Sequence, residues 1–66
     1  MKQLLTARTK AGLNQTQLAK MLGVDVATIS RYEAGKRHPE IKIARALNKM
    51  FKIPMAVLRP DIFAKN

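Results

Sequence analysis

The chain has 66 residues, enough for one small domain near the lower size limit for a self-sufficient hydrophobic core. Thirteen Lys and Arg against four Asp and Glu give a formal net charge of +9. This charge favours a polyanionic partner, most often nucleic acid, although a ribosomal protein or a membrane-surface peptide would show it equally well. The absence of Cys excludes disulfides and thiolate metal sites, and no apolar run reaches the ~20 residues of a membrane span, so we expect neither secretion nor a membrane partner.

Apolar residues recur at helical spacing along most of the chain, and no segment shows the alternation typical of a β-strand. We therefore expect an all-α fold, with one compact five-helix domain over residues 1–66 that ends in a short tail at 59–66. The helices are expected at residues 2–11, 15–22, 26–34, about 39–51 and around 55–58.

Capping residues set the expected helix starts. Asn14 and Gln17 form a capping box, in which the Asn side chain accepts from the Gln17 backbone N–H and the Gln side chain reaches back. Asp25 is the expected N-cap of the third helix. Pro39 is expected to open the fourth, because proline lacks the N–H that would go unpaired there, and Glu40 suits the positive end of a helix.

The most informative pattern is the spacing of a helix-turn-helix at residues 15–34. Ala19 supplies the small side chain where two steeply crossing helices approach, and Gly23 supplies the positive φ of the short turn. Ile29 belongs to the apolar seam that locks the second helix of the motif against the first, leaving its other face free for the DNA major groove. An amphipathic hairpin without DNA function would show the apolar spacing but rarely all three residues together.

Residues 3 to about 58 resemble the Cro/CI-type helix-turn-helix domain of lambdoid phage repressors and their bacterial relatives. The ending, residues 58–63, resembles more narrowly the small Cro-like phage and prophage regulators. The segments that carry the wider resemblance are Gly12-Leu13-Asn14-Gln15, Leu18-Ala19 with Gly23-Val24, Ile29-Ser30-Arg31-Tyr32-Glu33, and Gly35-Lys36.

The resemblance implies a lambda-repressor-like fold and a repressor that binds a two-fold operator in double-stranded DNA, with no cofactor, in the bacterial cytoplasm at the nucleoid. An antitoxin-type repressor that also binds a toxin protein is the alternative, and residues 55–66 are the only candidate contact for such a partner. The chain has no Ser/His/acid set, no paired carboxylates and no phosphate loop, so we do not expect an enzyme.

The third helix should read base edges, because it enters the groove N-terminus first. Arg31 is its only long hydrogen-bonding side chain there and can contact guanine O6 and N7. In related repressors polar residues such as Gln often stand at the positions of Val26 and Ala27. We therefore expect few direct contacts to base edges here, with more of the specificity coming from DNA shape. Packing of Val26 against the domain is the alternative for that side chain. The expected base-reading residues are Val26, Ala27, Ser30 and Arg31.

Phosphate contacts are expected where a helix start or a basic loop meets the DNA backbone. Asn14 and Gln15 offer free N–H groups at a helix N-terminus, and a basic loop follows the third helix. The resemblance further implies that Arg8 pairs with Glu33, tying the first helix to the third while leaving Arg8 near a phosphate. His38 has no second ligand at suitable spacing, so we expect no metal. The expected phosphate-binding residues are Arg8, Asn14, Gln15, Thr28, Lys36, Arg37 and His38.

The C-terminal segment is the only material for self-association. It carries more apolar side chains than one short helix can bury, and Met55 and Val57 are expected to be exposed. The available area is small, so we expect a weak homodimer that is strengthened on DNA.

Overall fold

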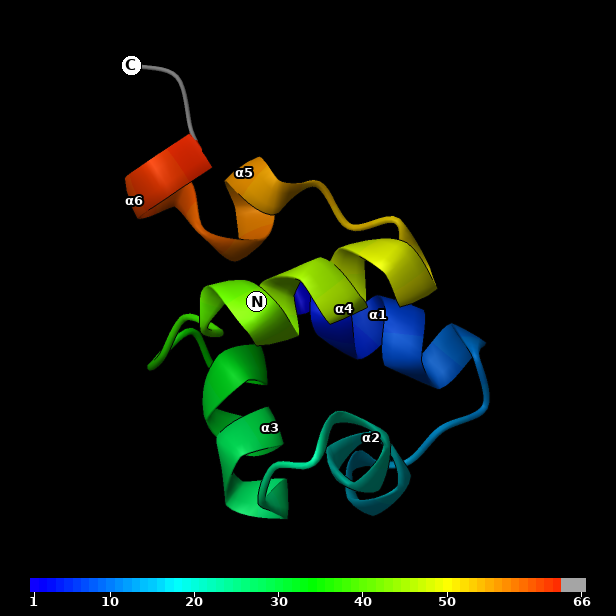
Figure 1. Ribbon diagram of the computed structural model, residues 1–66. Coiled ribbons are helices and arrows are strands. Elements are labelled where there is room, and N and C mark those ends of the chain that lie inside the picture. Colours follow the sequence, from blue (N-terminus) through cyan, green and yellow to red (C-terminus); the bar gives the residue numbers. More distant parts are fainter. Residues whose placement is uncertain (64–66) are drawn as a thin grey trace.

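The computed structural model describes residues 1–63, which fold into helices without any strand (Figure 1). The predicted all-α class is confirmed, but the count of five helices is wrong, because part of the expected tail forms a further helical turn. The remainder of that tail, residues 64–66, lies outside the described residues. The helices are α1 (Lys2–Lys10), α2 (Gln15–Leu22), α3 (Val26–Glu33), α4 (Ile41–Phe51), α5 (Met55–Leu58) and α6 (Pro60–Phe63).

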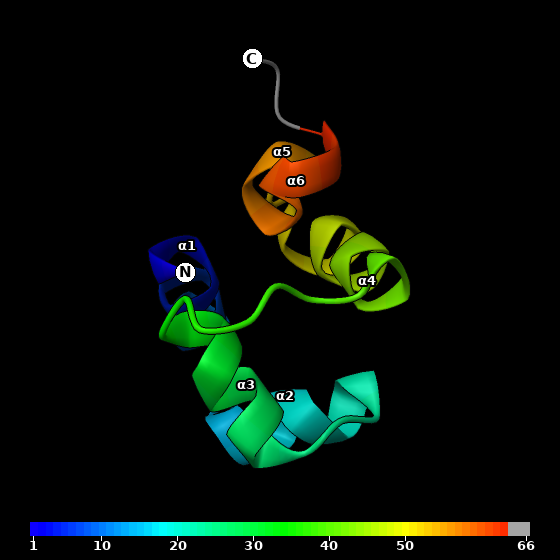
Figure 2. The same ribbon diagram turned by 90° about the vertical axis from the view of Figure 1, so that its left-hand side faces the viewer.

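The helices lie in three tiers, which the two ribbon views show from directions 90° apart (Figures 1 and 2). Helices α2 and α3 form one end, α1 and α4 cross the middle, and α5 with α6 forms the other end. Helix α3 contacts both α2 and α1, while α5 contacts α4 and α6. The α2–α3 pair is therefore the part of the molecule most distant from the C-terminal helices.

The hydrophobic core draws residues from the first five helices and the α4–α5 link. Ala19 is buried where α2 and α3 meet, as its small size predicts. Gly23 adopts φ +69°, and a Cβ at this position would meet nothing within 4 Å, so conformation and not space is what requires glycine here. The buried core residues are Leu4, Leu18, Ala19, Ile29, Tyr32, Ala44, Leu47, Ile53 and Leu58.

The capping box at the start of α2 is confirmed, and α3 begins at Val26 as expected, but the expected start of α4 at Pro39 is wrong. The Gln17 N–H donates to Asn14 Oδ1 over 2.7 Å, and the Asn14 N–H donates to Gln17 Oε1 over 2.8 Å. Asp25 occupies the N-cap position of α3 without a side-chain capping bond. Helix α4 begins two residues after Pro39, since the buried Pro39 ring and the bond that its carbonyl accepts from Arg59 (3.3 Å) hold it outside the helix.

The expected exposure of Met55 and Val57 is wrong. Both side chains are half-buried and pack against the core, because α5 lies flat on α4 and turns this face inward. The exposed apolar side chains at this end are Ile62 and Phe63 of α6, 49% and 42% exposed. A bidentate pair between Arg59 and Asp61, with 2.7 and 3.0 Å bonds, fixes the start of α6.

One carboxylate joins the three N-terminal helices. Glu33 of α3 accepts from Arg8 Nε of α1 at 2.6 Å and from Gln15 Nε2 of α2 at 2.9 Å. The Arg8–Glu33 pair implied by the family resemblance is therefore present, and it is less exposed than a surface pair, with 13% and 8% of the two side chains accessible. Arg8 Nη1 also donates to the Leu13 carbonyl at 3.0 Å, which fixes the α1–α2 link.

The network shifts the pKa values of both partners. Burial raises the pKa of Glu33, but the hydrogen bonds from Arg8 and Gln15, together with the charges of Arg8 and the N-terminal amine, outweigh burial and lower the pKa below its usual value. The hydrogen bond to Glu33 raises the pKa of Arg8. The ionised pair is thus favoured in the folded state.

We predict that Glu33→Gln lowers the free energy of unfolding at pH 7 by ~1–3 kcal/mol, because it leaves a poorly exposed guanidinium without its counter-charge. A carboxylate whose pKa is lower in the folded state stabilises the protein above its unfolded pKa, and this contribution disappears as the pH falls through the folded value. The gap between variant and wild type should therefore close progressively below about pH 4.5. Urea unfolding followed by circular dichroism between pH 3 and 7 measures it.

Glu40→Gln is the matched control, because Glu40 is 73% exposed and lies 3.6 Å from its partner Arg37. The change in the free energy of unfolding caused by Glu40→Gln should stay within ~0.5 kcal/mol. A Glu33→Gln deficit that is as large at pH 3 as at pH 7 would contradict the electrostatic account.

Candidate nucleic-acid interface

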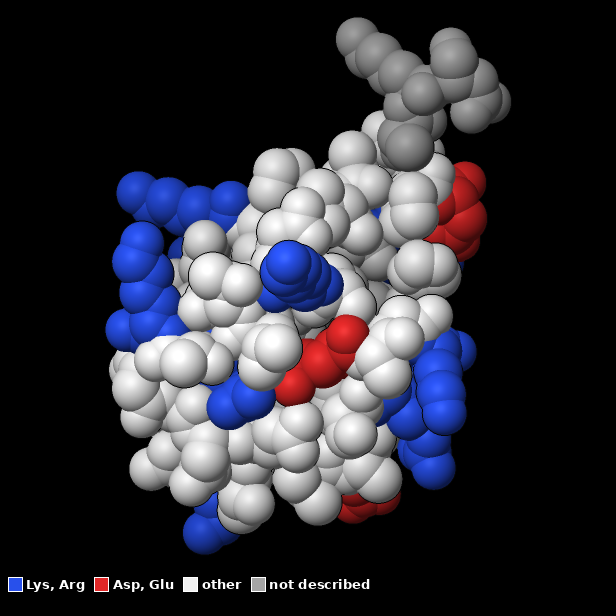
Figure 3. Space-filling model, turned by 180° about the vertical axis from the view of Figure 1, so that it is seen from behind, with Lys and Arg blue, Asp and Glu red and all other residues white. Residues whose placement is uncertain are grey.

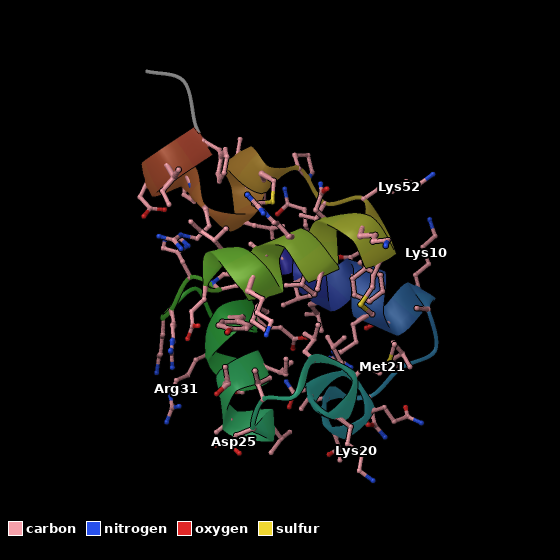
Figure 4. All side chains as sticks on the ribbon, viewed as in Figure 1. Lys10, Lys20, Met21, Asp25, Arg31 and Lys52 are labelled. Atoms are coloured by element: carbon pink, nitrogen blue, oxygen red, sulfur yellow. The ribbon has the colours of Figure 1, made fainter. Side chains whose placement is uncertain are left out.

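Helix α3 has one buried and one exposed face. Ile29 and Tyr32 point into the core, and Tyr32 is 1% exposed. The four side chains expected to read bases all lie on the outer face, and Arg31 extends away from the domain at its edge (Figure 4). Val26 is 45% exposed, which argues against the alternative that it packs on the body of the domain. The structure thus brings together Val26, Ala27, Ser30 and Arg31 on one surface.

The start of α2 offers backbone donors. The capping box satisfies the Gln17 N–H, while the N–H groups of Gln15 and Thr16 have no intrahelical partner. The Gln15 side chain is half-buried and its amide nitrogen donates to Glu33, so its free contribution at this surface is the backbone N–H. The exposed Thr16 adds a hydroxyl beside these donors. Sequence reasoning missed Thr16, although its place directly after the expected anion-binding residues was the available signal.

The loop after α3 carries exposed cations. The Lys36 N–H donates to the Arg31 carbonyl at 2.9 Å, which turns the chain back at the end of the helix. Lys36, Arg37 and His38 are exposed, and Thr28 of α3 is half-buried. Lys36 follows the C-terminal end of α3 closely, whereas Arg37 and His38 line a small cavity together with Met1 and Val57.

Arg8 lies behind this surface. Its guanidinium carries five N–H donors, of which three donate to Glu33 and to the Leu13 carbonyl. Its observed bonds all lie within the protein, and they hold α1 against α3 and the α1–α2 link. The main role that this geometry indicates for Arg8 is to position α1 relative to α3 and to the α1–α2 link.

The positive charge is not confined to α3. Seen from behind, Lys and Arg side chains gather at two opposite edges of the molecule, and further basic and acidic side chains lie on the surface between them (Figure 3). Figure 4 places Arg31 at one edge and Lys10 with Lys52 at the other. Net charge alone therefore does not indicate which of the two edges binds nucleic acid. The helix start, the basic loop and the exposed face of α3 favour the Arg31 edge.

A shallow groove of about 600 Å³ lies between α1 and the α4–α5 link. The residues that line the groove include no His, Cys, Asp or Glu. Within residues 1–63, no group of three or more His, Cys, Asp or Glu gathers as a metal site would require, and no helix is long and apolar enough to cross a membrane.

Comparison with known proteins agrees with this geometry. The family model described as helix-turn-helix matches residues 4–58. A protein of Pyrococcus furiosus, provisionally named an HTH-type transcriptional regulatory protein, is 40% identical over 57 residues, which is 85% of this chain. The chain spans only 18% of the length of that relative. No solved structure matches the chain. With the family model covering most of the chain and the α2–α3 geometry in place, the protein belongs to the helix-turn-helix family of DNA-binding domains.

Proposed function

We propose that the protein is a sequence-specific regulator of transcription that binds double-stranded operator DNA, and most concretely a Cro-like phage or prophage repressor. The observation that carries the proposal is the division of α3 into a buried face and an outer face that exposes every expected base-reading residue. The name of the Pyrococcus furiosus relative supports regulation of transcription. As a DNA-binding protein of this kind, it would act at the nucleoid of a bacterial host.

Reading and positioning fall to different side chains. Arg31 is exposed on α3 and has the length and the donors for a bidentate contact to guanine. Val26 and Ala27 offer only apolar contact, which suits a thymine methyl group. The donors at the start of α2 and the Lys36 loop lie to the sides of α3, as phosphate contacts require. The Glu33 network fixes the angle between these elements.

The proposed repressor binds as a two-fold dimer, since one α3 spans too few base pairs for operator-level affinity. Since Met55 and Val57, the contact expected from the sequence, are half-buried, the contact falls to the exposed Ile62 and Phe63 of the neighbouring α6. So small an apolar area supports only a weak dimer, formed mainly on DNA. In the antitoxin alternative the same apolar end would hold a toxin protein, and a stoichiometric non-self protein in complexes from the native host would favour that function.

We predict that wild-type protein binds a full operator, with half-sites ~10 bp apart, more tightly than an isolated half-site. A dimer with about eight phosphate contacts should show a slope of log K against log salt near about −7. Ile62→Asn should abolish the advantage of the full operator and leave half-site affinity unchanged. Fluorescence anisotropy with both duplexes at several salt concentrations measures this.

Leu5→Asn is the control, because it removes a similarly exposed apolar side chain from α1. A flat salt response, or equal affinity for one and two half-sites, would refute the dimeric DNA-binding function.

We further predict that Arg31→Ala weakens operator binding by ~1–3 kcal/mol and random-DNA binding far less, because a base contact is lost. Lys36→Ala should weaken binding to both DNAs about equally and reduce the salt slope, since a phosphate contact carries no sequence information. Titration of both variants against both DNAs separates the roles. Equal losses on operator and random DNA for Arg31→Ala would make Arg31 a phosphate ligand.

A further inference from the structure

One acidic side chain of this cationic protein has no basic partner in the described part of the chain. The sequence contains four acids, and arginines pair with three of them. Asp25 is the exception within residues 1–63. The three pairs are Glu33 with Arg8 at 2.6 Å, Glu40 with Arg37 at 3.6 Å, and Asp61 with Arg59 at 2.7 Å.

Asp25 does not perform the capping role that its position suggests. Its backbone has the extended N-cap conformation, φ −74° and ψ 152°, but its side chain accepts no capping hydrogen bond. The Thr28 N–H instead donates to the Asp25 backbone carbonyl at 3.0 Å. The carboxylate is exposed at the tip of the α2–α3 end, where α3 begins (Figure 4).

A carboxylate at this tip restricts how α3 can meet DNA. In the proposed function α3 enters the groove N-terminus first. Since close approach to a phosphate would place two negative charges together, base edges are the groups that this carboxylate can meet. The next two side chains, Val26 and Ala27, carry no hydrogen-bonding group that could compete for a base. A carboxylate only accepts hydrogen bonds, and the amino groups exposed in the major groove are cytosine N4 and adenine N6. Adenine N7 is an acceptor beside N6 and would repel the carboxylate, which leaves cytosine.

We infer that Asp25 is a specificity-determining residue that accepts a hydrogen bond from cytosine N4 in the operator. Asp25 precedes Arg31 by six residues, a rise of roughly 9 Å along the helix, so the two side chains address different base pairs. This inference rests on the proposed function and adds an acceptor to a surface on which Arg31 is the only long hydrogen-bonding side chain that the sequence indicates.

The experiment is selection of bound duplexes from a random pool, performed with wild type, Asp25→Asn and Glu40→Gln. Asn is as good an N-cap as Asp, so the fold of α3 is maintained. Wild type should prefer cytosine at one position of each half-site by about tenfold, and Asp25→Asn should lose this preference or move it to adenine, whose N6 and N7 suit an amide. Glu40→Gln makes the same change of charge at a largely exposed carboxylate outside α3 and should retain the wild-type base profile.

The outcomes distinguish a failure of the proposed function from a failure of the cytosine contact. A wild-type pool without any enriched sequence would refute the proposed function itself. An enriched wild-type motif that Asp25→Asn reproduces at every position, with only a uniform gain in affinity, would refute the cytosine contact and reduce Asp25 to a repulsive charge. Loss or reversal of the preference at a single pair supports the inference.

Discussion

The arrangement of α1, α2 and α3, which carry the proposed DNA contacts, depends on the carboxylate of Glu33. Helices of eight or nine residues are too short to be stable alone, so α1, α2 and α3 need contacts with one another. Hydrophobic packing between Leu4, Leu18 and Ile29 supplies most of that stability, but because it is non-directional it does not fix the angles between the helices. The hydrogen bonds from Arg8 and Gln15 to Glu33 do, because their geometry is specific. The Arg8–Glu33 pair, which the family resemblance implies, therefore helps to set the angle of α3 relative to α1 and α2.

The distribution of charge gives a second constraint. The protein carries a large positive charge, yet its acids are not spread at random, since three of them are held in arginine pairs. These pairs position helices or loops and lie away from the tip of α3. Asp25, which has no basic partner within residues 1–63, lies at that tip, where a basic side chain would suit a phosphate contact that carries no sequence information. In the proposed complex, an acceptor at this position lowers the affinity for DNA in general and adds discrimination between bases.

Sequence reasoning succeeded where the determining interactions are local. The Asn14–Gln17 capping box, the turn at Gly23 and the burial of Ile29 all follow from spacings within a few residues. It failed where the determining partner is distant, as at Pro39, which is held out of α4 by a bond from Arg59 twenty residues later. The exposure of Val57 was misjudged for the same reason, because the packing of α5 on α4 is not encoded in the spacing of either helix. Asp25 shows a third limit, since the sequence suggests an N-cap and only the structure shows that its side chain does not cap.

The central claim is that DNA lies across the Arg31 edge and not across the equally basic edge of Lys10 and Lys52. Amide chemical-shift changes of ¹⁵N-labelled protein, titrated with a half-site duplex, test it directly. The account predicts the largest changes at residues 14–16, 25–31 and 36–38, with little change near Lys10, Lys52 and the groove between them. The largest changes at Lys10 and Lys52, with α3 unaffected, would contradict it.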